Sequence, residues 1–168
     1  CGTAPGTIAT CIAGEAALAW YMLSQANLIS DPITTTDYEA FTLTISDAVL
    51  PQTKMGRGAR MAVMANGGLN YFVIANFGTS ALANGTTTFT PAMSPLDAFQ
   101  FDSKLDDSIP TSGTVRSIAV ATALPGTNAN GANPVTSSVC YDSTANTYAT
   151  GTVAGNNVNC TLGIQTAF

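Results

Sequence analysis

The sequence predicts an α+β domain, because two stretches have the spacing of helices and two others have the pattern of a β-hairpin. Apolar residues recur at helical spacing over residues 15–29 and again over 95–105. Residues 59–65 and 69–77 are strand-like and flank the turn sequence Asn-Gly-Gly at 66–68. A chain of 168 residues that is 46% hydrophobic is long enough for one domain with its own core, and we see no internal repeat. We therefore predict a single domain over residues 1–168.

The first helix is predicted over residues 15–29, which are rich in strong helix formers. Asp31-Pro32 should stop it, because proline disfavours helical geometry in the residue before it. Trp20 and Leu23 fall on the same side, which is most simply the side facing the core. The alternative for Trp20 is an aromatic surface on which a ligand stacks.

The second helix is predicted to begin at Ser94, whose side chain can cap it, with Pro95 in its first turn and Asp97 near the positive end of its dipole. Its apolar side is predicted to consist of Leu96, Phe99, Phe101 and Leu105, while Asp102 and Lys104 point outward. Asp106-Asp107, Pro110 and Gly113 should then end the helix and turn the chain.

Further strands are predicted on both sides of this helix. Residues 114–124 alternate and are rich in β-branched side chains, so they should form a strand that packs back on the helix. Residues 78–93 are a Thr-rich connection in which TTTFT, at 86–90, is a short strand candidate. Residues 1–13 and 126–134 are dominated by small or polar residues and are predicted to be loops.

Charged residues make up only 9% of the chain, far below the roughly 25% of ordinary soluble domains. The polar surface must therefore consist of Thr, Ser, Asn and Gln, which is typical of a protein outside the cytoplasm that contacts copies of itself. The net charge is −5 with five basic residues, which leaves no basic stripe for nucleic acid or for an anionic membrane.

The four cysteines fall into two close pairs, Cys1 with Cys11 and Cys140 with Cys160. An even number in this composition favours disulfides and an oxidising compartment over free thiols. Three connectivities are open, and proximity favours the local one. Zinc is disfavoured because the chain has no His and no C-x-x-C spacing.

The residues that could carry chemistry do not form a catalytic set. The absence of His excludes Ser-His-Asp and Cys-His catalysis, and neither Lys54 nor Lys104 lies in a recognisable nucleophile motif. We therefore predict no enzyme and no cofactor. Asp102, Asp106 and Asp107 are weak candidates for calcium, or they cap and terminate the helix. Lys54, Arg57 and Arg60 form either a solvated face or a contact for an acidic neighbouring subunit.

Four stretches, in the same order along the chain, resemble the type IV pilin-like and pseudopilin family. The run from Asp102 to Gly113 resembles the family segment D-x-K-[IL]-D-D-G-x-P-x-x-G, with Ser108 in place of its first glycine. Outside this run, the residues that carry the resemblance are Glu15, Ala19, Trp20, Leu23, Ala26, Leu28, Ile29, Pro51, Lys54, Gly56, Cys140, Tyr148, Cys160, Leu162, Ile164 and Phe168.

The resemblance implies a pilin-type head, with helices packed on an antiparallel sheet and a disulfide-closed C-terminal loop. It implies a structural subunit of a type IV pilus or of a type II secretion pseudopilus, which assembles with copies of itself and with other pilin-like subunits. The alternative is an extracellular adhesin or a ligand-binding minor pilin. The location would be extracellular or periplasmic, and calcium sites occur in some pseudopilins. Family members begin with a long apolar helix that anchors them in the membrane, so this chain would be the soluble head without that helix.

Overall fold

The computed structural model describes residues 15–34, 42–44, 46–66, 69–81, 86–118, 140–142, 144–151 and 157–166. The helices are α1 (Glu15–Gln25) and α2 (Pro95–Leu105). The strands are β1 (Thr42–Thr44), β2 (Arg60–Asn66), β3 (Leu69–Ala81), β4 (Thr86–Thr90), β5 (Val115–Ser117), β6 (Tyr141–Asp142), β7 (Thr147–Tyr148) and β8 (Leu162–Thr166). This content confirms the α+β class.

The main sheet is built around the long strand β3, which pairs antiparallel with four other strands. Its first half lies between β2 and β8, with Phe72 opposite Val63 on one side and Ile164 on the other. Its second half pairs with β1 and β4, and the register to β4 shifts between Phe77 and Ser80. Strand β5 continues the sheet beyond β8, and β6 and β7 form a separate two-stranded sheet. The predicted hairpin and the strand at 86–90 are thus confirmed.

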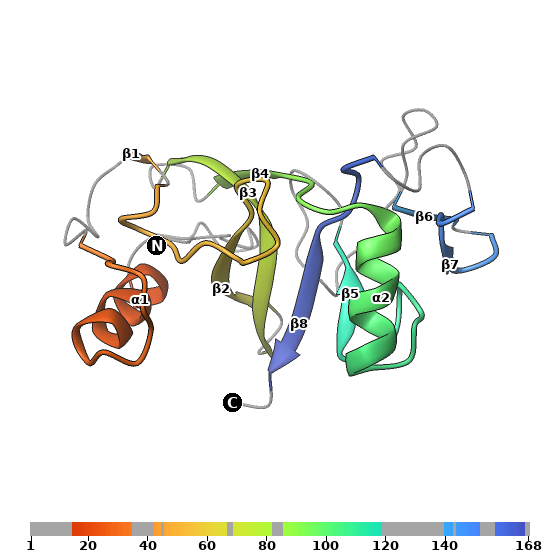
Figure 1. Ribbon diagram of the computed structural model, residues 1–168, viewed down its shortest axis with the longest axis horizontal. Helices are drawn as coiled ribbons and strands as arrows, with labels where there is room; N and C mark the ends of the chain where they lie inside the picture. The colour runs from red at the N-terminus through yellow and green to blue at the C-terminus, as the bar shows by residue number, and fades with distance from the viewer. Residues whose placement is uncertain are drawn as a thin grey trace, which may run out of the picture.

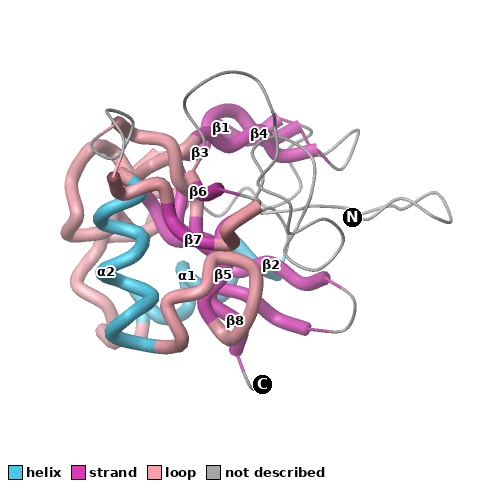
Figure 2. The backbone as a smooth tube through the Cα atoms, turned by 90° about the vertical axis from the view of Figure 1, so that its right-hand side faces the viewer, coloured by secondary structure: helices cyan, strands magenta, loops and turns pink. Residues whose placement is uncertain are grey.

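The two helices lie at opposite ends of the sheet, α1 beside β2 and α2 beside β5 and β7 (Figure 1). The view from the side places the small β6–β7 sheet next to α2 (Figure 2). A disulfide joins Cys140, at the start of β6, to Cys160, just before β8. The prediction of that bridge is confirmed, and the second sheet is covalently attached to the end of the main one.

The core consists of two apolar clusters that share β3. Tyr71, Val73 and Ala75 alternate along β3 and pack in a first cluster with Trp20, whereas Ile74 belongs to a second cluster around α2 and the disulfide. Met61 packs against both clusters. Over residues 73–75 the period of two in the strand therefore places alternate side chains in different halves of the core, whereas Phe72 also packs against the first cluster.

Helix α1 ends four residues earlier than its apolar pattern predicts. The residue responsible is Asn27, which adopts a left-handed backbone (φ 54°) that asparagine tolerates better than most side chains and that commonly terminates helices. Leu28, which the pattern places on the helix, lies after this turn and is 71% exposed. Asp31-Pro32 therefore follows the end of the helix and does not cause it.

The buried side of α2 also differs from the prediction. Ala98 and Asp102 are fully buried, whereas Leu96, Phe99 and Leu105 are exposed by 38–58%. Asp102 was expected to point outward with Lys104, and only Lys104 does. Ala98 is small and allows close packing. The carboxylate of Asp102 accepts hydrogen bonds from donors inside the fold, so this face can be buried although its apolar content is low.

Several predictions fall wholly or partly on residues that are not described: the bridge between Cys1 and Cys11, the loops at 1–13 and 126–134, and the strand beyond 118. Within the described residues, that strand is shorter than predicted and ends at Ser117. No helix of the described part is long and apolar enough to cross a membrane.

Trp20, 6% exposed, offers the first test of the core. Replacing it with alanine should lower the free energy of unfolding by about 3–5 kcal/mol, as other large-to-small core substitutions do. Met22 is on the same helix but 61% exposed, so Met22→Ala is the matched control and should have little effect. Denaturant unfolding followed by circular dichroism measures both, and similar losses in the two variants would contradict this account of the core.

Candidate functional site

Helix α2 positions the acidic residues, and its N-terminus is built as predicted. The hydroxyl of Ser94 accepts a hydrogen bond from the Asp97 N–H at 3.1 Å, and the Ser94 N–H donates to the Asp97 carboxylate at 3.3 Å. This reciprocal capping box satisfies two backbone donors that would otherwise lack partners. The helix ends at Asp106, whose N–H donates to the Asp102 carbonyl.

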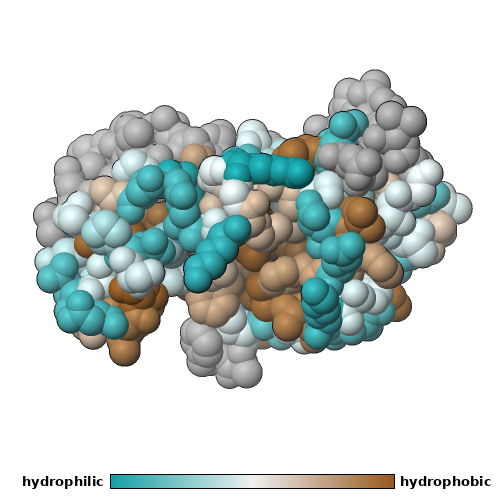
Figure 3. Space-filling model, viewed as in Figure 1, coloured by the Kyte–Doolittle hydropathy of each residue, from teal (hydrophilic) through white to brown (hydrophobic). Residues whose placement is uncertain are grey.

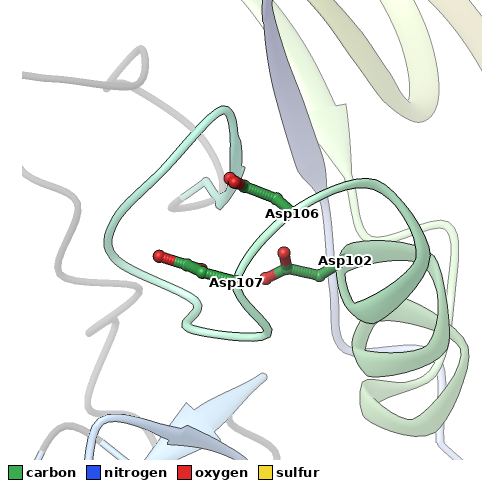
Figure 4. A group of neighbouring side chains, drawn as sticks. All are labelled: Asp102, Asp106 and Asp107. Atoms are coloured by element: carbon green, nitrogen blue, oxygen red, sulfur yellow. The ribbon is translucent and has the colours of Figure 1, made fainter.

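Three carboxylates converge where α2 ends. Asp102, Asp106 and Asp107 each offer an oxygen within 4.8 Å of the others, and Figure 4 shows them around the turn that follows the helix. Asp102 is buried, Asp106 is half-buried and Asp107 is exposed. The structure thus brings together all three residues that the sequence singles out.

Asp102 lies at the centre of the site, where solvent does not reach it. Its carboxylate accepts the Tyr148 hydroxyl at 2.9 Å and the Ser108 N–H at 3.2 Å. Burial raises the pKa of Asp102 above 3.8, and these two hydrogen bonds oppose the rise. Burial, together with the bond to Asp102, also raises the pKa of Tyr148, so its hydroxyl stays a donor at any physiological pH.

The other two carboxylates organise the turn. Asp106 accepts the N–H groups of Thr114 and Val115, the second at 3.0 Å, so it holds the start of β5. Asp107 accepts the Ile109 N–H at 2.8 Å and the Ser112 hydroxyl at 2.7 Å. Asp102 and Asp107 thus accept N–H bonds from within the 108–113 turn.

Two positions of the turn need a left-handed backbone. Gly113 has φ 70°, and a Cβ atom placed there would overlap the carboxylate of Asp106. Ser108 has φ 67°, a conformation that costs a residue with a side chain about 1–2 kcal/mol. Glycine at 113 is therefore required by both the backbone and the space, whereas serine at 108 is tolerated with strain.

The disulfide-bonded tail closes over this turn from the other side. The Thr111 hydroxyl donates to the side-chain oxygen of Asn146 at 2.7 Å, and the ring of Tyr148 meets Phe99 edge-on with centroids 6.2 Å apart. The Cys140–Cys160 bridge holds the segment that contains these residues. The site therefore joins α2, the turn, β5 and the tail.

The acidic cluster does not by itself establish a calcium site. Calcium takes six to eight oxygen ligands, whereas five of the six carboxylate oxygens here already accept hydrogen bonds from protein donors. Those N–H and O–H groups point their positive ends at the carboxylates, where a cation would have to lie. The arrangement fits a loop-fixing role better than a metal site.

The three basic candidates lie on the loop before β2 and at its start. Arg60 forms an ion pair with Asp47 and also donates to the Gly58 carbonyl, so it anchors its own loop. Arg57 lies 3.7 Å from Asp97 with both side chains about half exposed, a pair that contributes little in water. Lys54 is exposed and forms no ion pair within the described residues. Two of the three are therefore already paired within the chain, and their role as a contact for a neighbouring subunit stays a prediction.

Comparisons with models of protein families, with curated proteins and with solved structures gave no match to this chain. The sequence reasoning missed two partners of the site, Tyr148 and Asn146, because both lie more than 30 residues away from the groups they bind. No local pattern points to these partners, because Asp102 lies on a helix face of low apolar content and a buried carboxylate finds its donors elsewhere in the fold.

Gly113→Ala tests how tightly the turn is packed. It should lower the free energy of unfolding by at least about 2 kcal/mol, because it adds a steric overlap with Asp106 to the cost of a left-handed alanine. Gly56→Ala is the control: φ is 74° but no atom lies within 4 Å of the added Cβ, so about 1 kcal/mol is expected. Equal losses in urea denaturation would show that the packing against Asp106 does not matter.

Thermal unfolding with calcium and with a chelator tests whether the three aspartates stabilise the turn or bind a metal ion. We expect the same midpoint in both, and a loss of about 1 kcal/mol for Asp107→Ala under either condition, because two hydrogen bonds disappear. Asp142→Ala is a matched control, since Asp142 accepts two N–H bonds in a turn outside the cluster. A midpoint that rises with calcium in the wild type and in Asp142→Ala, but not in Asp107→Ala, would make the cluster a cation site.

Proposed function

We propose that the chain is the head domain of a structural subunit of a type IV pilus or a type II secretion pseudopilus, which acts by self-assembly and catalyses no reaction. The observation that carries this proposal is the turn after α2. The resemblance to pilin-like proteins rests above all on the run from Asp102 to Gly113, and five positions of that run have a physical task in the turn. Asp102, Asp106 and Asp107 accept its hydrogen bonds, and Ser108 and Gly113 supply its left-handed backbone.

Position 108 is an informative detail of this match. The family pattern has glycine there, and the backbone of Ser108 adopts the left-handed conformation for which glycine is best suited. The departure from the pattern therefore keeps the same geometry with a strained residue. The left-handed backbone at position 108 therefore supports the proposal that the chain shares this turn with the family.

Two further features support the proposal. The Cys140–Cys160 disulfide is compatible with an extracellular or periplasmic location. A surface with few charges and many Ser, Thr and Asn residues suits repeated contacts between identical subunits, because such contacts bury little charge. The partners in this proposal are copies of the chain and other pilin-like subunits.

The test is to isolate native surface filaments and search them for this chain by mass spectrometry, with antibody labelling against the domain under the electron microscope. We expect the chain in the filament fraction and labelling along the fibre. A strain without the gene should lose the filaments or protein secretion and regain them on complementation. Labelling confined to the fibre tip would favour the adhesin or minor-pilin alternative. Absence from the filaments, with no secretion defect, would reject both.

A further inference from the structure

A pocket of about 550 Å³ lies between the two helices, which is within the size range of small-molecule sites. Its walls are the side chains of Trp20, Ile29, Met61, Ile74 and Phe101, and the loop from Pro51 to Met55 borders it. Figure 3 shows apolar side chains on this face, over the strands between α1 and α2. The pocket is separate from the acidic cluster and uses none of its residues.

Lys54 is the charged residue at this pocket. Its ammonium has no ion pair within the described residues, whereas Arg57 and Arg60, on the same loop, are paired with Asp97 and Asp47. The amide of Gln52, which also borders the pocket, is bonded to Asp47 at 2.8 Å. Among the described residues, Lys54 is therefore the cation of this loop that has no ion-pair partner, and it lies beside an apolar surface.

Two polar atoms of the lining residues are also unsatisfied. The indole nitrogen of Trp20 and the hydroxyl of Thr53 are buried and have no hydrogen-bond partner among the described residues. Trp20 is 94% buried, and such groups normally find partners in folded proteins. Neither atom is accessible to solvent, so the polar group that this pocket offers to a ligand is the Lys54 ammonium.

We propose that this pocket binds a small single-chain amphiphile, with its apolar body against Trp20, Met61 and Ile74 and its carboxylate paired with Lys54. An extended peptide fits less well, because the loop has few backbone groups to offer it. The Thr53 N–H and carbonyl and the Pro51 carbonyl are already bonded to Ala59, Gly56 and Met61. The uncommitted groups are one cation and an apolar wall, and these match a molecule with one anionic end.

Trp20 makes the proposal measurable, because it is the only tryptophan of the chain and it lines the pocket. The probes are decanoate, decanol and decyltrimethylammonium, which share a chain and differ in the charge of the head group. Titrated below micelle formation at low salt, decanoate should give a saturable change in Trp20 fluorescence. It should bind about fivefold more tightly than decanol, the size expected for one exposed ion pair, and the cation should bind least.

Lys54→Met keeps an unbranched side chain one atom shorter and removes its charge, so it should abolish the preference for decanoate while decanol still binds. Lys104→Met is the matched control, since Lys104 is also exposed, forms no ion pair among the described residues and does not line the pocket. It should leave the preference unchanged, and unchanged thermal midpoints should show that both variants are folded.

Three results would overturn the proposal. They are no saturable change with any probe, equal binding of decanoate and decyltrimethylammonium, and a preference for decanoate that survives Lys54→Met. A dilution series without any probe tests whether a second copy of the chain covers the pocket instead. A Trp20 fluorescence change that depends on protein concentration alone would show this and would also contradict the proposal. Failure of the amphiphile to bind would leave the filament assay untouched, because the proposed assembly does not depend on it.

Discussion

The burial of Asp102 is the constraint on which the α2 half of the structure depends. A carboxylate without access to solvent is costly, and only donors supplied by the fold can compensate for it. Those donors come from two distant places, the turn through Ser108 and the tail through Tyr148. Helix, turn and tail must therefore be in place together to accommodate this side chain, so we expect the three segments to fold cooperatively.

The turn after α2 also fixes the position of strand β5 in the main sheet. Asp106 accepts the N–H groups at the start of β5, the Ser117 N–H donates to the Pro110 carbonyl at 2.8 Å, and β5 then pairs with β8. Cys160 lies just before β8, and its N–H and carbonyl are both bonded to the 92–93 segment ahead of α2. Backbone hydrogen bonds thus connect the start of α2, the turn, β5 and β8 in a closed series of contacts, and the buried disulfide attaches the tail to it.

The elements whose signals are local could be predicted from the sequence. The Ser94 cap, the hairpin and the Cys140–Cys160 bridge depend on residues close together in the chain. The buried face of α2 could not be predicted in this way, because periodicity assigned Phe99 to the core and Asp102 to the surface. The structure reverses both assignments, and the hydroxyl that accommodates the buried Asp102 belongs to Tyr148, 46 residues away. The end of α1 was also missed, because the left-handed Asn27 overrides a favourable apolar pattern.

The charge of Asp102 has a consequence for stability whose direction can be worked out. Its pKa in the folded state lies above the value of 3.8 that it has when unfolded, so its ionised form is disfavoured in the fold at neutral pH. That cost diminishes as the pH falls through the raised pKa, because the folded state takes up the proton first. Below 3.8 the unfolded chain is protonated as well, and the contribution levels off. The charge of Asp102 therefore contributes more favourably to folding in mild acid than at neutral pH.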